Sequence, residues 1–265
     1  MTSIPLRDRL RLGVRAVGFT GWTFGMYGLL EVATLSAKTP AEVEATLRDF
    51  VVRYGRGLCK IFGLEIQTEG LPEGELYRGT DERGLGRVFL SNHRSGLDVL
   101  VTLAHLEGRH VSRADLASWP VIGVAARRAG VLFVDRGNKK SGSAVVQAMI
   151  DAVEKGQGVI IYPEGTTFTG DEVRPFKAGA LTVARRTGCE IVPVGLAYAG
   201  EHMRIEEDFA QHMQRAGGAA KTRVALVAGE AYRLTKDNDH AEETARARER
   251  VQAAVNRARE LVGPG

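Results

Sequence analysis

The chain has 265 residues, of which 44% are hydrophobic and 26% are charged. These fractions are typical of a compact globular protein and exclude a fibrous or disordered chain. The net charge of +4 is too small to choose among nucleic acid, an anionic membrane and an anionic substrate as partners.

The first predicted element is a helix at the N-terminus that resembles a membrane anchor. Four arginines precede an uncharged apolar segment, residues 16–30; they are Arg7, Arg9, Arg11 and Arg15. The segment is shorter than the about 20 residues that a spanning helix needs. We therefore expect a helix that lies at the headgroup boundary, and a core-packing helix is the alternative.

A second helix is predicted from Pro40 to Phe62, because Thr39 is a suitable capping residue and Pro40 favours the first helical position. After Gly63 the pattern changes to short β-branched runs that alternate with helical stretches, which is typical of an α/β sheet. We thus predict a helical membrane-associating element over 1–62 and an α/β domain over 63–265.

The α/β domain is predicted to contain a mixed, mostly parallel sheet flanked by helices. Strands are expected at 64–68, 88–91, 131–135, 159–162, 191–197 and 224–229. Helices are expected near 97–106, 121–129, 141–155, 178–186 and 240–261. Cys59 and Cys189 have no partner at zinc or redox spacing, so we predict two buried thiols on the cytoplasmic side of a membrane.

The first motif places His93 in a turn after an apolar strand, with Asp98 five residues further on. An aspartate that accepts a hydrogen bond from one imidazole nitrogen leaves the other free to take a proton from a hydroxyl. Alone the pair is weak evidence, because Asp98 could simply cap the next helix. The other five histidines show no comparable setting and are expected to be surface or core residues.

Two further strand ends carry polar side chains. Arg136 follows the strand at 131–135, where it could bind a phosphate or simply be solvated. Glu164 and Gly165 follow the strand at 159–162, and Lys177 precedes the next helix, where it could meet an anion. The alternative for Glu164, Gly165 and Lys177 is an ordinary loop and helix cap without a function. Three strand ends with polar side chains in one sheet, however, indicate a single site.

These motifs together resemble the glycerolipid acyltransferase family, including bacterial 1-acylglycerol-3-phosphate acyltransferases. The blocks that carry the resemblance occur in the family's order; they are Asn92-His93-Arg94-Ser95-Gly96-Leu97-Asp98 (the His-x4-Asp block), Phe133-Val134-Asp135-Arg136, Tyr162-Pro163-Glu164-Gly165-Thr166 and Ile191-Val192-Pro193-Val194. Arg113 and the residues that follow it resemble a lysine-containing segment between the first two blocks. The resemblance covers about residues 60–230, and the N-terminal helix pair looks like the docking element of some bacterial members.

The resemblance implies that His93 deprotonates the acceptor hydroxyl while Asp98 orients the ring. It also implies a set of substrate-binding residues, namely Asn92, Arg113, Arg136, Glu164, Gly165, Thr166, Lys177 and Pro193. The family attacks the thioester directly, and the chain has no Gly-x-Ser-x-Gly elbow and no evident nucleophilic cysteine. No cofactor or metal is implied, and the acyl donor would be acyl-CoA or acyl carrier protein.

One departure concerns the acceptor. Members acting on lysophosphatidate often have arginine after Glu-Gly-Thr, whereas this chain has Thr167. Loss of a bidentate contact could cost about 1.5–3 kcal/mol of binding unless Lys177, Arg174 or Arg113 compensates. The leading expectation is acylation of 1-acyl-sn-glycerol-3-phosphate to phosphatidate, and another lysolipid such as lyso-ornithine lipid is the alternative.

Two other classes of function remain in view. A hydrolase could use the same base to activate water, although the sequence offers no dedicated nucleophile. An inactive membrane-binding protein is disfavoured by the intact motif around His93 and Asp98. The expected partners are a lysophospholipid, the acyl donor and a membrane surface, with no nucleic acid. The expected location is the inner membrane, with a peripheral or monotopic attachment and the active site on the cytoplasmic side.

Overall fold

The computed structural model describes residues 5–72, 76–135, 139–177, 179–203, 209–234 and 239–263. Its helices are α1 (Leu6–Leu35), α2 (Pro40–Phe62), α3 (Leu97–His105), α4 (Ile122–Arg128), α5 (Lys139–Glu154), α6 (Gly179–Thr187), α7 (Phe209–Gly218) and α8 (His240–Val262). Its strands are β1 (Leu64–Glu69), β2 (Val88–Ser91), β3 (Arg109–Arg113), β4 (Leu132–Val134), β5 (Val159–Ile161), β6 (Glu190–Tyr198), β7 (Thr222–Ala228) and β8 (Tyr232–Arg233). Short 3₁₀ turns lie at Ala114–Ser118 and Glu201–Met203.

The strands of the described residues form one sheet in the order β1-β7-β6-β2-β5-β3-β4, with β8 also paired to β6. The run from β6 to β4 is parallel, whereas β7 and β8 pair with β6 in antiparallel fashion and β1 is parallel to β7. This confirms the predicted mixed, mostly parallel sheet. Because β6, β2 and β5 are adjacent and parallel, the loops after their carboxyl ends meet at one edge.

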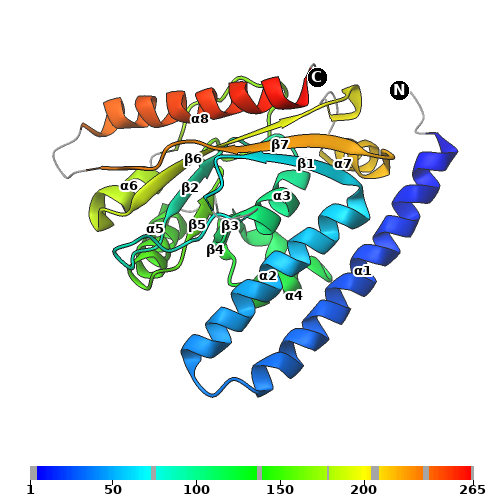
Figure 1. Cartoon of the computed structure of the whole chain (residues 1–265), viewed down its shortest axis with the longest axis horizontal. Coiled ribbons are helices and arrows are strands. Elements are labelled where there is room, and N and C mark those ends of the chain that lie inside the picture. Colours follow the sequence, from blue (N-terminus) through cyan, green and yellow to red (C-terminus); the bar gives the residue numbers. More distant parts are fainter. Residues whose placement is uncertain are drawn as a thin grey trace.

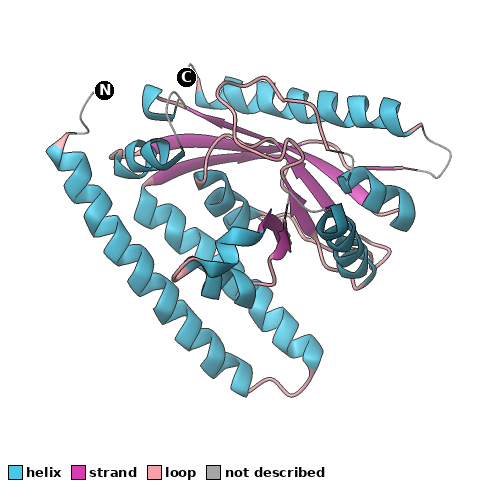
Figure 2. Ribbon diagram, turned by 180° about the vertical axis from the view of Figure 1, so that it is seen from behind, coloured by secondary structure: helices cyan, strands magenta, loops and turns pink. Residues whose placement is uncertain are grey.

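Helices cover both faces of the sheet (Figures 1 and 2). One face packs against α5, α6 and α8 through a core that includes Leu90, Val153 and Val251. The opposite face packs against α3 and α7 through a core that includes Phe89, Leu97 and Leu226. Both cores contain central-strand residues with no exposed surface, which is why these strands read as continuous apolar runs.

The N-terminal helices form an outer layer beyond α3 and α7, beneath the sheet in Figure 1. The predicted start of α2 is confirmed, because the Thr39 hydroxyl accepts a hydrogen bond from the Glu42 amide at 3.2 Å and Pro40 is the first helical residue. Gly63 ends α2 in the left-handed conformation, with φ of 69°. Among the described residues, no helix combines the length and apolar character needed to cross a bilayer.

Arg15 explains why α1 stays attached to the domain. Its guanidinium is buried and donates to the carbonyl oxygens of Gly217, Ala219 and Ala220 at the end of α7, at 2.6–3.0 Å. Arg11 donates to the next carbonyl in this group, that of Gly218. Cations at a helix C-terminus bind carbonyls that have no intrahelical partner and favour the helix dipole.

Candidate active site

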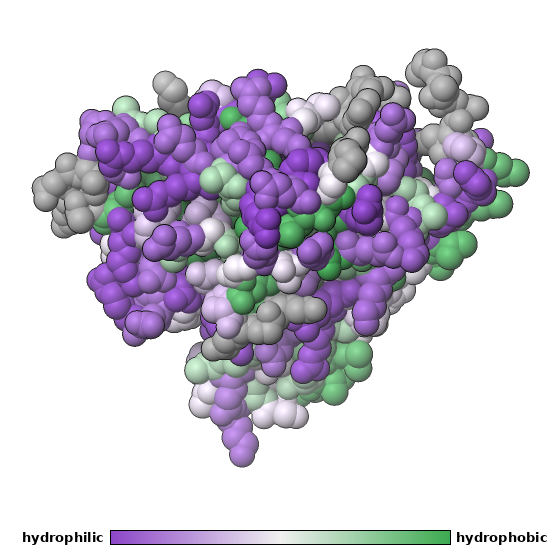
Figure 3. All heavy atoms as spheres, turned by 45° about the horizontal axis from the view of Figure 1, so that its top comes forward, coloured by the Kyte–Doolittle hydropathy of each residue, from purple (hydrophilic) through white to green (hydrophobic). Residues whose placement is uncertain are grey.

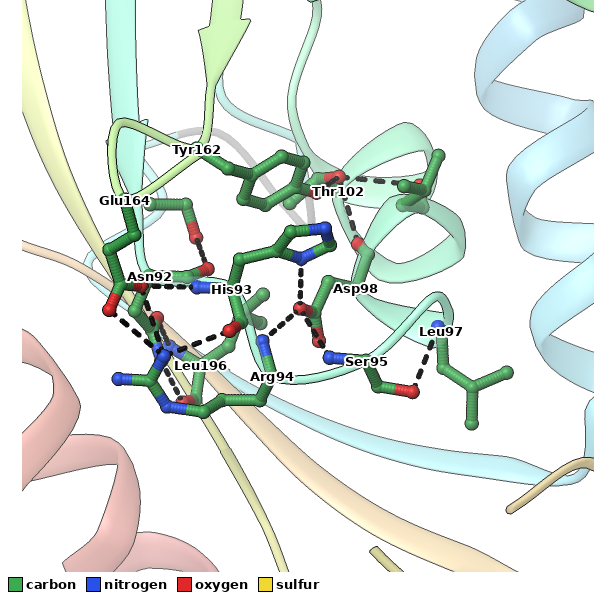
Figure 4. A network of polar contacts seen from close by, with 12 residues as sticks. Asn92, His93, Arg94, Ser95, Leu97, Asp98, Thr102, Tyr162, Glu164 and Leu196 are labelled. Carbon is green, nitrogen blue, oxygen red and sulfur yellow. Dashed lines mark hydrogen bonds and ion pairs between the residues drawn. The ribbon is translucent and has the colours of Figure 1, made fainter. Parts of the chain in front are cut away.

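His93 and Asp98 lie side by side in the loop and first helical turn that follow β2 (Figure 4). The Nδ1 atom of His93 is 2.7 Å from Oδ2 of Asp98. Asp98 has no exposed surface, whereas the His93 side chain is 17% exposed. No described residue bonds the other ring nitrogen, Nε2, so this arrangement leaves Nε2 able to accept a proton.

The Asp98 carboxylate also receives hydrogen bonds from three other groups. The backbone amides of Arg94 and Ser95 donate to Oδ2 at 2.6 and 2.9 Å. The Tyr198 hydroxyl, from the end of β6, donates to Oδ1 at 2.7 Å. Asp98 is also in the first turn of α3, where the helix dipole favours a negative charge. These donors provide hydrogen bonds to both oxygens of a carboxylate that has no exposed surface.

Tyr162 fixes the plane of the His93 ring. The two rings are stacked with centroids 4.2 Å apart and an interplanar angle of 17°. The Tyr162 hydroxyl lies 2.8 Å from Oγ1 of Thr102, which is 2.9 Å from Nε2 of His110. Burial, and then the charge of Asp98, raises the pKa of Tyr162 well above its ordinary value. Burial, and then His93, lowers the pKa of His110 to about 3, so this histidine stays neutral.

Glu164 holds the His93 loop rather than facing solvent. Its side chain has no exposed surface. One carboxylate oxygen accepts from the His93 amide at 2.8 Å and from the Arg94 guanidinium at 3.0 Å. The other oxygen accepts from the Arg174 amide at 2.8 Å. Where a contact with substrate was expected, the structure shows an internal ion pair, since all of this carboxylate is buried among protein donors.

Asn92 is likewise turned into the protein. Its amide nitrogen donates to the carbonyl oxygen of Leu196, and its amide oxygen accepts from the Leu196 N–H, both at 2.8 Å. The side chain has no exposed surface. It therefore joins the end of β2 to β6, and the expected substrate contact is replaced by a contact that positions the next residue, His93.

Pro193 lies on the wrong side of the sheet to shape the pocket directly. It pairs in register with Leu90, whose side chain belongs to the core under α5 and α8. Its neighbours Val192 and Val194 belong to the opposite core, with Phe89 and Leu97. Since successive side chains alternate between faces, Pro193 faces away from the His93 side.

The loop after β5 does present groups to solvent beside His93. Gly165 has φ of 80°, a conformation that favours glycine. A Cβ atom there would lie 2.7 Å from both Cε and Nζ of Lys177, so the lysine side chain passes directly over Gly165. Lys177 and Thr166 are exposed. This part of the predicted site is therefore brought together and offers a cation, a hydroxyl and a bare backbone.

Two predicted arginines are not placed in this group. Arg113, at the end of β3, is exposed and forms a bidentate ion pair with Asp115 at 2.8 and 2.9 Å. Arg136 lies outside the described residues. The role of each in binding the acceptor stays a prediction.

The sequence analysis missed several residues that organise the site. Arg94 is the buried partner of Glu164, and Tyr198 is a donor to Asp98. His212 of α7, treated as a filler, lies 2.9 Å from the hydroxyl of Ser95 in the same loop as His93. The one available signal was the proximity of Arg94 and Ser95 to the motif, since Tyr198 and His212 are about a hundred residues away along the chain.

Comparisons with known proteins find acyltransferases. Residues 72–197 match the family model described as Acyltransferase. The chain is 30% identical to a 1-acyl-sn-glycerol-3-phosphate acyltransferase of Neisseria meningitidis over 57% of this chain and 56% of that protein. It is 27% identical to a lyso-ornithine lipid O-acyltransferase of Pseudomonas aeruginosa, over 72% of this chain and 70% of that protein. The first of these matches thus spans little more than half of the relative.

A solved structure has the same fold. The crystal structure of the 1-acyl-sn-glycerophosphate acyltransferase PlsC from Thermotoga maritima aligns with a TM-score of 0.73. The alignment covers 95% of this chain and 96% of that one, at 17% sequence identity. At this identity the likeness supports the fold, including the arrangement of helices on a mostly parallel sheet.

The buried ion pair leads to a prediction on stability. We expect Glu164→Gln to lower the free energy of unfolding by about 3–5 kcal/mol, because the Arg94 cation would remain buried without its anion. Urea titration followed by circular dichroism measures this change. The matched control is Glu172→Gln on the same loop, whose side chain is 71% exposed and forms an ion pair with Arg174. The control should change the free energy of unfolding by less than about 0.5 kcal/mol. An equal loss in both variants would contradict a stabilising role for the buried Glu164–Arg94 ion pair.

Proposed function

We propose that this chain, which belongs to the glycerolipid acyltransferase family, transfers a fatty acyl group from an acyl thioester to the hydroxyl of a lysophospholipid. The observation that carries the proposal is the hydrogen bond between His93 and the buried Asp98, with Nε2 bonded by none of the described residues. A base held in this way can activate a hydroxyl group, and that hydroxyl must be supplied by a second molecule, the acceptor.

The proposed reaction needs no enzyme-bound intermediate. Nε2 of His93 takes the proton from the acceptor hydroxyl while the oxygen attacks the thioester carbonyl. Asp98 stabilises the imidazolium that forms. The C–S bond then breaks, and the thiolate leaves with the proton from the imidazolium. No metal or cofactor takes part, and the donor is acyl-CoA or acyl carrier protein.

The acceptor that we propose first is 1-acyl-sn-glycerol-3-phosphate, which would give phosphatidate. The Neisseria relative bears the name of an enzyme for this acceptor, and the exposed Lys177 beside Gly165 supports binding of a phosphate. The Pseudomonas relative bears the name of an enzyme for lyso-ornithine lipid, which keeps that acceptor as the alternative. Thr166, Arg113 and Arg136 are the further residues that we propose for the head group.

An acceptor assay separates these two. We expect purified protein to use lysophosphatidate with a kcat/KM at least about tenfold above that for lyso-ornithine lipid, because a phosphate can accept several charge-assisted hydrogen bonds. Both acceptors should be presented in the same detergent micelles with the same acyl-CoA, and the lipid products resolved by mass spectrometry. The reverse preference would reassign the acceptor, and no transfer to either would refute lysolipid acylation.

The base itself is tested by substitution. His93→Ala and Asp98→Asn should each lower kcat/KM by about 10²–10⁴-fold, because general-base catalysis and its orienting acid are lost. His240→Ala, at the start of α8, is the control and should keep the activity of the unsubstituted protein. Circular dichroism establishes that each variant is folded. Full turnover by folded His93→Ala would rule out this mechanism.

A membrane surface is the second partner that we propose, and α1 carries the evidence for it. Seven of its large apolar residues, each at least 52% exposed, recur with Gly21 and Gly28 every three or four positions and so share one face of the helix; they are Leu6, Leu10, Val14, Val17, Phe24, Val32 and Leu35. Leu29 and Tyr27 are also exposed but lie beside this face. Figure 3 shows apolar residues along the outer edge of the molecule where α1 lies.

This stripe supports a helix that lies in the headgroup region rather than one that crosses the bilayer. Arg7 and Arg9 are exposed on the first turns of the same helix, where they could meet anionic lipids. We propose a peripheral or monotopic attachment to the inner membrane, with the active site on the cytoplasmic side.

Charges placed in the stripe test the attachment. Val14→Asp with Val17→Asp should lower partitioning onto phosphatidylglycerol vesicles by about tenfold or more, because two apolar contacts are lost and two charges repel the lipid. Both positions are more than 70% exposed, so folding should not suffer. The control adds the same two charges to α8 at exposed positions, as Ala241→Asp with Ala253→Asp. Equal co-sedimentation of both variants would contradict docking through α1.

A further inference from the structure

Tyr198 reaches the catalytic pair from the opposite side of the buried carboxylate. It is the last residue of β6, and its ring packs in the same core as Phe89 and Leu97. Its side chain is buried, and its hydroxyl donates to Oδ1 of Asp98 at 2.7 Å. No part of the motif around His93 predicts this contact, because it joins residues 100 positions apart.

The two oxygens of Asp98 are supported very differently. Oδ2 is held by His93 and by the amides of Arg94 and Ser95. Among the described residues, Oδ1 has one donor, the Tyr198 hydroxyl. Since the carboxylate has no exposed surface, water cannot easily replace that donor. Removing the hydroxyl would leave Oδ1 buried and unbonded.

We propose that Tyr198 is a positioning residue for the general base, which holds the Asp98 carboxylate toward His93 and limits how strongly it retains the imidazole proton. Its importance for acyl transfer rests on the function proposed above, but its effect on the His93 ring does not. The hydroxyl shares the negative charge of Asp98, so less of that charge acts on the imidazolium. Loss of the hydroxyl would therefore strengthen the attraction between the Asp98 carboxylate and the imidazolium.

The Tyr198 hydroxyl stays protonated, and so remains a hydrogen-bond donor to Asp98, at neutral pH. Burial, and then the charge of and hydrogen bond to Asp98, raises the pKa of its hydroxyl well above the ordinary value. The other titratable and charged groups around the pair, from the elements packed against it, are Arg94, Glu164, Tyr162, His110, His212 and Cys59. Arg94 and Glu164 neutralise each other, His110 stays neutral, and burial raises the pKa of Cys59 to about 12. Removal of the Tyr198 hydroxyl should therefore change the titration of the His93 ring.

The test is a pH titration of the His93 ring by NMR in protein labelled with ¹⁵N-histidine, with His93→Ala used to assign the signal. In Tyr198→Phe the pH of half-protonation should rise by about half a unit to one unit, since a hydrogen bond to a charged group is lost. The matched control is Tyr54→Phe, which removes the hydroxyl bonded to Thr23 at 2.9 Å between α1 and α2 and should leave the titration unchanged. An unchanged titration in Tyr198→Phe overturns the proposal.

A second variant covers the case in which Tyr198→Phe does not fold. Site-specific 3-fluorotyrosine at position 198 keeps the ring and makes the hydroxyl a stronger donor, so half-protonation of His93 should move to lower pH. A shift to higher pH, or none, overturns the proposal.

Activity gives the third readout. The acidic limb of the pH profile of kcat/KM should move to higher pH in Tyr198→Phe by the same amount as the NMR titration, because the protonated ring cannot act as a base. If the ring titration shifts while the protein acylates no lysolipid, the proposed function fails and the role of Tyr198 stands. If the protein is active and the limb does not move, the role of Tyr198 fails alone.

Discussion

The buried carboxylate of Asp98 is the group on which the rest of the site depends. An unpaired charge with no exposed surface would be strongly unfavourable, so the fold must bring donors to it. It does so from two places: the loop after β2, through the Arg94 and Ser95 amides, and the end of β6, through the Tyr198 hydroxyl. His93 completes the set, and its ring is therefore held by the same requirement that stabilises the charge. Stability and chemistry here rest on one set of hydrogen bonds.

The sheet order explains why these groups can meet. Because β2 lies between β6 and β5, and all three are parallel, the loop of His93 is flanked by the end of β6 and the loop after β5. Asn92 ties the His93 loop to β6 through Leu196, and Glu164 ties it to the loop after β5 by accepting from the His93 amide. The polar residues nearest the motif thus hold the His93 loop in place, whereas Thr166 and Lys177 face solvent.

The sequence was informative about which strand ends carry the site and less so about where side chains point. The short spacing of His93 and Asp98 was enough to predict their pairing, since a turn of five residues can fold back on itself. Glu164 and Arg94 are 70 positions apart, so no local pattern identified their ion pair. Pro193 lies within β6, and its side chain points to the other face of the sheet. The strand β3 was missed because Arg109, His110 and Ser112 interrupt its apolar character.

The N-terminal arginines likewise show that the sequence indicates which residues are present but not where their side chains point. As a group of four before an apolar segment they indicated a membrane anchor, but Arg11 and Arg15 bind the carbonyl end of α7. Together with the packing of α1 on α2, this attachment sets which side of α1 faces the protein, and the stripe from Leu6 to Leu35 lies on the outer side. The contacts of Arg11 and Arg15 with the end of α7 thus contribute to the outward orientation of the apolar face. Hydrophobicity alone could not have assigned it, because α1 also carries apolar residues on its buried side, such as Met26 and Leu30.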